Sequence, residues 1–226
     1  MVMEKLYGMN MVRRFLWNTR VGYLNQRSKA GQPEVPLLEV TNQANVVSNK
    51  GPLVMYALRQ YVGEEPLNAA LRRLVARHGS GGPPFVTSRD LYREVQGVTP
   101  PEYHYLLQDL LETITLWDLR TTAVAAEPAG NGAWRVTLEV EAQKFRADGS
   151  GKETEAPMND FVEIGVFGEE TADPLYLRKH RIRSGRQRIT VIVNGKPARA
   201  GLDPQLLLID RNWTDNLRPV MVEQSR

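Results

Sequence analysis

The side chains that most often hold a catalytic metal ion are few and scattered in this sequence. Its three histidines, His78, His104 and His180, stand far apart, and none pairs with another four positions away to face one ion from a helix. There are no cysteines, which excludes a thiolate zinc site, an iron–sulfur cluster, a disulfide scaffold and a cysteine nucleophile in this chain. We therefore expect this chain to hold no metal by itself.

Two glycine-rich segments have the composition of an anion-binding loop. Residues 79–82 (GSGG) are followed by Pro83 and Pro84, which lack N–H donors, and no helix begins there to supply its positive end. Residues 149–153 (GSGKE) have a glutamate where a phosphate-binding loop needs a hydroxyl, and the first glycine of that motif is absent. The sequence therefore predicts a flexible linker at 79–84 and a hairpin turn at 148–151. It contains no Gly-x-Ser-x-Gly nucleophile elbow.

The densest basic stretch runs from Arg178 to Arg188. Its cationic residues alternate with Leu177, Ile182 and Ile189, which is typical of the solvated face of a β-hairpin. The whole chain has 29 lysines and arginines against 26 aspartates and glutamates, a net charge of +3. This weak excess does not resemble the concentrated basic face of a nucleic-acid binder, so we predict no nucleic-acid partner.

Apolar residues recur at helical spacing up to about residue 113. The segment Val2 to Gln26 predicts a helix, although Gly8 and Gly22 inside it leave open two shorter helices, since each glycine costs about 1 kcal/mol relative to alanine. Further helices are predicted from Gly51 to just before Gly63, from Glu64 to about His78, from a capping box at Thr87 and Asp90, and from a second box at Thr99 and Glu102 to about Glu112.

From residue 114 onward apolar and polar residues alternate, as in strands. Trp134, Val136, Leu138 and Val140 fall on one face of such a strand. Strands are predicted at 134–142, 161–167, 175–182, 188–193 and 206–209, with turn signals at Asp148–Gly151 and Asn194-Gly195. The predicted fold class is α+β in two parts. An N-terminal α-helical bundle (1–113) precedes an antiparallel, immunoglobulin-like β-sandwich (114–226).

The composition is that of a folded protein, with 42% hydrophobic and 24% charged residues. No run approaches the roughly 18 consecutive apolar residues of a spanning helix, and Met1–Asn10 lacks a signal-peptide layout. We therefore expect a soluble segment without direct membrane insertion.

The stretch from Val47 to Glu65 (VSNKGPLVMYALRQYVGEE) resembles a segment of the zinc aminopeptidases of the aminopeptidase N type, peptidase family M-one. There an aromatic–x–Lys–Gly signature opens a helix that ends in Leu-Gly-Glu-like residues. Residues 67–74 are similar to the next helix of that family. Segments similar to the bacterial subset fused to transporter-like membrane segments occur in the same order at 12–16, 23–24, 36–37, 116–119, 153–154, 200–204 and 208–211.

This family binds zinc through a His-Glu-x-x-His helix and a downstream glutamate, and the glutamate of the motif activates water. By this alignment those residues would precede Met1. The resemblance therefore implies the C-terminal segment of a peptidase that removes N-terminal residues from peptides. Residues 1–113 would be the helical remainder of its catalytic domain and 114–226 a β-sandwich domain, inactive alone. The alternative is a non-catalytic interaction or scaffold module derived from such a peptidase.

The same resemblance implies which partners this chain would have. Zinc and the peptide substrate would belong to the parent protein, and the upstream zinc-binding half would be the direct partner of this chain. The parent would be attached to the bacterial inner membrane or else be cytoplasmic. Helix faces that would pack on the missing half should be exposed and apolar, so they also predict self-association.

One position departs from the family pattern. The family's tyrosine before x-Lys-Gly donates a hydrogen bond to the oxyanion formed at the peptide carbonyl, and Ser48 occupies that position here. Ser48 is thus the candidate catalytic residue, with a shorter reach than a phenol. Three explanations stay open. The parent protein is weakened or noncatalytic, a neighbouring residue replaces the tyrosine, or the alignment with the family has a different register. Tyr56 and Tyr61 fit the core stripe of the following helix better than a site.

Overall fold

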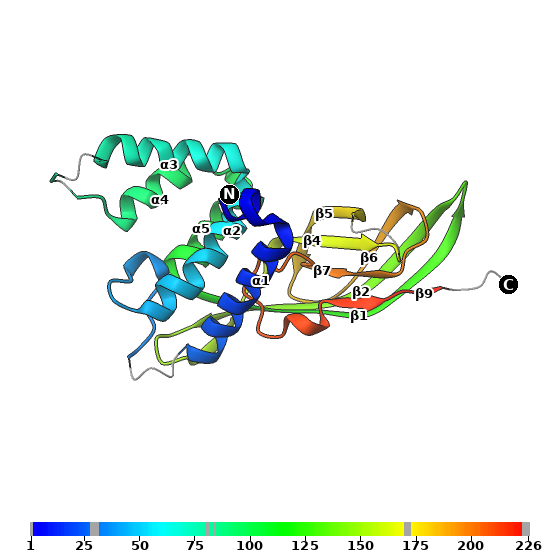
Figure 1. The fold of residues 1–226 in the computed structure, drawn as a ribbon. Coiled ribbons are helices and arrows are strands. Elements are labelled where there is room, and N and C mark those ends of the chain that lie inside the picture. Colours follow the sequence, from blue (N-terminus) through cyan, green and yellow to red (C-terminus); the bar gives the residue numbers. More distant parts are fainter. Residues whose placement is uncertain (1, 28–31, 80–81, 84, 170–172, 223–226) are drawn as a thin grey trace. The chain divides into compact units, whose positions relative to one another are not determined.

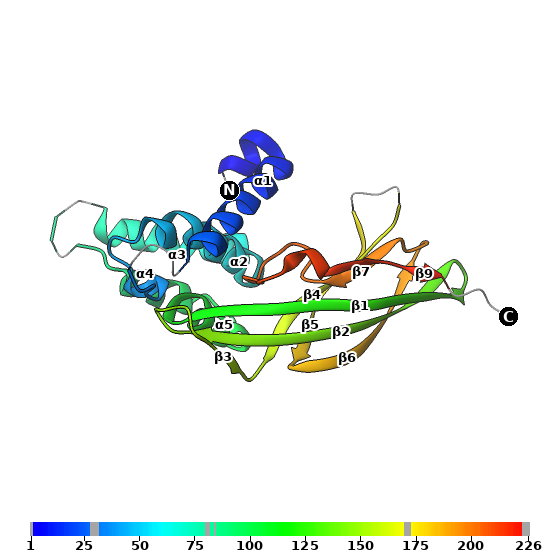
Figure 2. The ribbon, with the colours of Figure 1, turned by 90° about the horizontal axis from the view of Figure 1, so that it is seen from below.

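A computed structural model describes residues 2–27, 32–79, 82–83, 85–169 and 173–222. The chain forms two compact units, one of helices and one of strands (Figures 1 and 2). The helical unit comprises Met1–Thr115 together with Arg146–Glu153, the tip of a β-hairpin. The strand unit comprises Leu116–Phe145 and Thr154–Arg226. The α+β class, with helices preceding two mainly antiparallel sheets, is as predicted.

The helical unit contains α1 (Val2–Gln26), α2 (Gly51–Val62), α3 (Glu64–His78), α4 (Ser88–Gln96) and α5 (His104–Leu107). Short 3-10 turns lie at Leu37–Glu39 and Pro101–Tyr103, and π-helical turns at Val46–Lys50 and Gln108–Glu112. Among the residues described, no helix is both long enough and apolar enough to cross a membrane.

Helix α1 bends at a glycine. Gly8 has φ 76° and ψ 169°, a conformation that side chains other than glycine rarely adopt, and it divides the element into two helices. The two-helix interpretation is therefore correct for Gly8. Gly22 lies within regular helix, where it lets α1 approach the following turn, because a Cβ there would lie 3.0 Å from Nδ2 of Asn49.

Helices α2 and α4 begin and end at the predicted local signals. Pro52 occupies the first turn of α2, and Gly63, with φ 103°, ends it. At the start of α4 the amide of Asp90 donates to Oγ1 of Thr87 (3.3 Å), and the amide of Thr87 donates to Oδ2 of Asp90 (2.9 Å). The first capping box is confirmed.

The second predicted capping box is wrong. The hydroxyl of Thr99 donates to the carbonyl oxygen of Val95 (2.7 Å) and so closes the end of α4 instead of capping a new helix. The segment that follows is a 3-10 turn, the single turn of α5 and a π-helical turn, not one continuous helix. A threonine just beyond the end of a helix can donate to one of the last carbonyl oxygens of that helix, which have no partner within it. The sequence pattern took account only of the helix predicted after Thr99, not of the helix that precedes it.

The strand unit contains two sheets. The first has the order β3-β2-β1-β9, with β6 also paired to β2, and the second has the order β5-β4-β7-β8. The strands are β1 (Ile114–Gly130), β2 (Ala133–Ala147), β3 (Glu153–Ala156), β4 (Asn159–Phe167), β5 (Pro174–Arg183), β6 (Gly185–Asn194), β7 (Arg199–Leu202), β8 (Leu217–Pro219) and β9 (Met221–Val222). Figure 2 shows β1 and β2 as long neighbouring strands.

The alternating pattern of the predicted central strand is confirmed. Val136, Leu138 and Val140 on β2 are buried, and they share a face of the strand with Trp134. The turn at residues 148–151 is also confirmed, since Oδ1 of Asp148 accepts hydrogen bonds from Ser150 and from the amide of Lys152. It joins β2 to β3 as a hairpin turn.

Residues 206–209 do not form the predicted strand. The side chain of Asp203 accepts hydrogen bonds from the amides of Leu207 and Leu208, both at 2.9 Å, and Leu206 has a positive φ of 54°. Leu207, Leu208 and Ile209 are buried, which explains the apolar run. A carboxylate therefore binds the amides of Leu207 and Leu208, while the carbonyl oxygen of Ile209 accepts a hydrogen bond from the amide of Trp117 on β1 (3.0 Å).

The predicted hairpin over Arg178–Arg188 is also wrong. Strand β5 pairs with β4, whereas β6 pairs with β2 in the other sheet. The chain therefore crosses between sheets at Ser184 and Gly185, where Gly185 has φ 90°. The Asn194-Gly195 turn likewise joins strands of different sheets, β6 and β7, with Gly195 at φ 101°.

Candidate functional site around Lys50

The candidate catalytic residue lies on the π-helical turn Val46–Lys50, immediately before α2. The side chain of Ser48 is exposed, whereas Lys50, two residues later, is completely buried. The two side chains therefore point to different sides of the same turn. This leaves the hydroxyl of Ser48 accessible from solvent and places the ammonium of Lys50 inside the helical unit.

Lys50 belongs to a cluster of five polar side chains, here called the Lys50 cluster: Tyr23, Arg27, Glu34, Lys50 and Glu153. Oε1 of Glu34 accepts a hydrogen bond of 2.6 Å from the phenol of Tyr23 and one of 3.4 Å from Nζ of Lys50. Nε of Arg27 lies 3.6 Å from Oε2 of Glu34, and Nη1 of Arg27 donates to Glu153 at 2.8 Å. The cluster balances two cations with two carboxylates.

Burial shifts the titration of this cluster. Desolvation lowers the pKa of Lys50, and the charge of Glu34 opposes that shift. Desolvation, together with the charge of Glu34, raises the pKa of Tyr23 well above its ordinary value. Tyr23 therefore remains a protonated donor to Glu34 at neutral pH. Nζ of Lys50 also lies 5.5 Å from the centre of the Tyr23 ring, within reach of a cation–π contact.

Four separate segments bring the Lys50 cluster together. Tyr23 lies on α1 with Arg27 directly after it, Glu34 lies in the loop that follows, and Glu153 lies at the hairpin tip that belongs to the helical unit. These contacts join residues up to 126 positions apart. Sequence reasoning named Lys50 only as part of a motif and missed the cluster, because no local pattern links Glu34 or Glu153 to it.

The other residues that sequence analysis tested do not form a site. Nε2 of His104 lies 2.9 Å from the carbonyl oxygen of Thr99, and Nε2 of His180 lies 2.7 Å from the phenol of Tyr176. His78 is the last residue of α3. Within the described part of the chain, no group of three or more His, Cys, Asp or Glu side chains could hold a metal ion.

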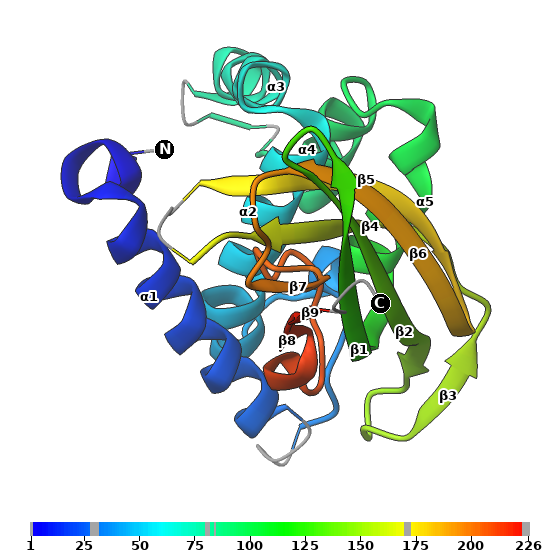
Figure 3. The ribbon, with the colours of Figure 1, turned by 90° about the vertical axis from the view of Figure 1, so that its right-hand side faces the viewer.

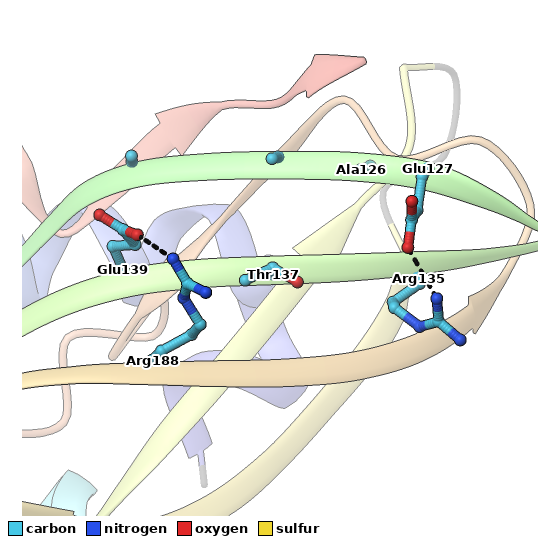
Figure 4. Close-up of a pocket in the computed structure, with 8 residues that line it drawn as sticks. Ala126, Glu127, Arg135, Thr137, Glu139 and Arg188 are labelled. Carbon is cyan, nitrogen blue, oxygen red and sulfur yellow. Dashed lines mark hydrogen bonds and ion pairs between the residues drawn. The ribbon is translucent and has the colours of Figure 1, made fainter. Parts of the chain in front are cut away.

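A shallow groove of about 280 Å³ crosses one face of β1, β2 and β6 (Figure 4). Arg135 pairs with Glu127 (2.7 Å) and Arg188 pairs with Glu139 (2.8 Å), as the dashed lines show. The charges that line the groove therefore neutralise one another. This arrangement is that of a solvated sheet surface and leaves little charge for a ligand.

Four acidic side chains are buried in the described part of the strand unit: Asp160 and Glu163 on β4, Asp203 after β7, and Asp210. Asp210 accepts hydrogen bonds from the amides of Leu119 and Asn212, at 3.2 and 2.9 Å. Glu163 is less well satisfied. Its Oε1 lies 3.4 Å from Nε2 of Gln205 and 3.7 Å from Nζ of Lys179. Its Oε2 has no hydrogen-bond partner among the described residues.

Burial, reinforced by the nearby charge of Asp203, raises the pKa of Glu163 to about 7. Between the ordinary value of 4.5 and about 7 the folded chain holds a proton that the unfolded chain has lost, so stability falls as pH rises through this window. Glu163→Gln removes this dependence. We expect urea denaturation to show it more stable than the wild type by about 2 kcal/mol at pH 8.5 and equally stable near pH 4.5.

Glu169 is exposed, so Glu169→Gln serves as the matched control and should leave the pH profile unchanged. Burial also raises the pKa of Asp210 to about 7. Part of the decrease in stability with rising pH should therefore remain in both variants. A Glu163→Gln profile that parallels the wild type at every pH would show that Glu163 is ionised at no cost in the folded state.

No protein-family model matches the sequence, and no curated protein matches it.

Proposed function

We propose that this chain is the C-terminal segment of a zinc-dependent aminopeptidase of the aminopeptidase N type, and that it completes an upstream zinc-binding half. The observation that carries the proposal is the place of the Lys50-Gly51 signature. Helix α2 begins at Gly51 and ends just before Gly63, so the signature stands at the start of a helix with the length of the family segment that it resembles. Peptides with a free N-terminus would be the substrate of the assembled protein.

In this proposal the two sides of the turn Val46–Lys50 have different roles. Ser48 is exposed and faces the reacting peptide carbonyl supplied with the upstream half. Lys50 is a positioning residue that fixes the turn through Glu34 and touches no substrate. Zinc and the residues that bind it belong to the upstream half, so the chain is inactive alone. Attachment of the parent to the bacterial inner membrane is part of the same proposal.

Helix α1 offers a surface for that half. Leu6 and Tyr7 before the bend at Gly8, and Met11, Phe15 and Trp17 after it, are between 38% and 67% exposed, which is unusual for so many large apolar side chains on one element. Beside them an apolar groove lies between α1 and α2, lined by Val12, Phe15, Leu16, Pro52 and Tyr56. We propose that the upstream half covers this surface, and that a second copy of the chain covers it when that half is absent.

The immunoglobulin-like sandwich is part of the proposal for the strand unit. Its support is a buried contact that joins the two sheets. Asp160 on β4 accepts hydrogen bonds from Nε1 of Trp117 on β1 (2.8 Å) and from Nζ of Lys144 on β2 (2.9 Å). All three side chains are buried. Facing sheets with one shared core are the architecture of a β-sandwich.

The test is a reconstitution. The polypeptide encoded directly upstream in the gene is produced separately, and leucyl-p-nitroanilide hydrolysis is measured with each part alone and with both together in the presence of zinc. We expect turnover only for the mixture, and loss of turnover on chelation. Chelator-sensitive turnover by this chain alone would refute the proposed division of roles. An upstream reading frame without His-Glu-x-x-His would favour the alternative of a scaffold module.

A further inference from the structure

Strand β5 (Pro174–Arg183) lies at the edge of its sheet. It pairs with β4 from Asn159↔Arg183 to Phe167↔Pro174, and in the sheet order β5-β4-β7-β8 it has no second neighbour. Figure 3 shows β5 outermost in this sheet, beside β4. Half of the backbone N–H and C=O groups of an edge strand point away from the sheet, where another strand can pair with them. At the end of β5 the amide and the carbonyl oxygen of Arg183 are already bonded to the side chain of Gln187, at 3.1 and 2.6 Å, so the edge available for pairing precedes Arg183.

The arginines of β5 have no carboxylate opposite them on β4, whereas Lys179 lies opposite Glu163, with Nζ 3.7 Å from Oε1. Arg178 lies opposite Ile164, His180 opposite Val162, and Arg181 opposite Phe161, all apolar partners on β4. The described residues include no carboxylate that pairs with Arg178, Arg181 or Arg183. These arginines can therefore pair with carboxylates of a strand added at the free side of β5.

Strand β6 shows that this chain does neutralise strand cations elsewhere. Arg188 lies directly opposite Glu139 on β2 and pairs with it at 2.8 Å. Arg186 lies opposite Glu141, at 3.6 Å. The two strands follow one another in the chain, but both arginines of β6 lie opposite a glutamate on β2, whereas on β5 only Lys179 lies opposite a glutamate, Glu163 on β4. Arginines without an acidic residue in register are therefore found on β5 and not on β6.

The arginines of β5 are also held in place. The guanidinium of Arg181 stacks 4.0 Å from the centre of the Phe161 ring, and its Nη1 donates to the carbonyl oxygen of Asn159. The guanidinium of Arg178 lies 5.6 Å from the ring centre of Tyr176. Arg178 and Arg181 are three residues apart, so they extend from opposite faces of the strand. A strand added to this edge would meet a positioned cation on each face.

We propose that the free edge of β5 binds an extended acidic segment of a partner protein, which adds to the sheet as a further strand. Backbone hydrogen bonds to β5 would supply affinity, and carboxylates on both faces of the added strand would pair with Arg178 and Arg181. This site lies within the strand unit and does not depend on the peptidase proposal.

The experiment measures fluorescence anisotropy of a short capped peptide of valine and glutamate, with carboxylates on both faces of its extended form. A control peptide has the same charge but proline in place of valine, and so cannot complete a strand ladder. We expect the valine peptide to bind at least tenfold more tightly than the proline peptide. The double variant Arg178→Gln/Arg181→Gln should weaken binding about tenfold.

A second double variant, Arg72→Gln/Arg93→Gln, removes two exposed charges from the helical unit and should leave the affinity unchanged. Equal affinity for the valine and proline peptides would overturn the proposal, since it would reveal charge attraction alone. Absence of binding to either peptide would also overturn the proposal, and the arginines would then serve to prevent unwanted pairing at an exposed edge strand. Tighter binding of a single-stranded oligonucleotide of equal charge would overturn it in favour of a nucleic acid.

Discussion

Glu34→Gln is expected to destabilise the helical unit by about 3–5 kcal/mol at pH 7, because it leaves a buried ammonium without its counter-charge. Lys50 is completely buried, and Glu34 is the carboxylate that contacts it. Glutamine keeps the size of the side chain and an oxygen that can accept from Tyr23, so the change removes mainly the charge. Urea denaturation followed by far-UV circular dichroism, which the helices dominate, measures the loss.

The pH dependence identifies the cause of that loss. Burial lowers the pKa of Lys50 from 10.5, so between the folded value and 10.5 the unfolded chain binds more protons than the folded chain. Stability therefore rises with pH in this window. Without Glu34 the pKa of Lys50 should fall further, so Glu34→Gln should recover much of its deficit by pH 10. A purely steric defect would persist at every pH.

Two further variants complete this test. Glu34→Gln/Lys50→Met removes both charges and should recover most of the stability, since a buried ion pair replaced by apolar groups is often neutral. Glu65→Gln breaks the exposed pair with Arg72 and should cost less than about 1 kcal/mol. If Glu34→Gln and Glu65→Gln lost the same small amount, the Lys50 cluster would not stabilise the turn that carries Ser48.

The features that sequence analysis predicted correctly depend on short-range physics. Pro52 and Gly63 set the ends of α2 through their own backbone preferences, and the capping box of α4 needs only Thr87 and Asp90. The alternation of Val136, Leu138 and Val140 reports burial on one face of a single strand. Each of these signals is complete within a few residues.

The errors arise where distant residues compete for the same groups. The apolar run Leu206–Ile209 resembles a strand, but Asp203 binds its amides and bends it. The run Arg178–Arg188 resembles a hairpin, but its halves pair with β4 and β2, which no local pattern specifies. The Lys50 cluster was missed for the same reason, since Glu34 and Glu153 contribute to it from separate segments of the chain. Ser48 is a candidate only because of the motif that it belongs to, and it stays a prediction.

If the chain completes an aminopeptidase as proposed, Ser48→Tyr is expected to raise kcat of the reconstituted enzyme by about 10²–10³-fold, since one oxyanion donor is typically worth that much. Ser48 is exposed, so the larger side chain needs no repacking of the helical unit, and the stability of this chain should change by less than about 0.5 kcal/mol. A donor that acts only on the developing oxyanion stabilises the transition state and not the bound substrate. We therefore expect KM to change little.

Ser48→Phe is the matched control for this prediction, because it supplies the same ring without the hydroxyl. The increase in kcat should be absent from Ser48→Phe if the phenol donates the hydrogen bond, and present in both variants if the ring only fills space beside the substrate. An unchanged kcat in Ser48→Tyr, with zinc bound to the upstream half and both parts assembled, would place the oxyanion donor elsewhere. In that case the alignment of Ser48 with the family's tyrosine would be wrong, even though the position of Lys50-Gly51 at the start of α2 would stand.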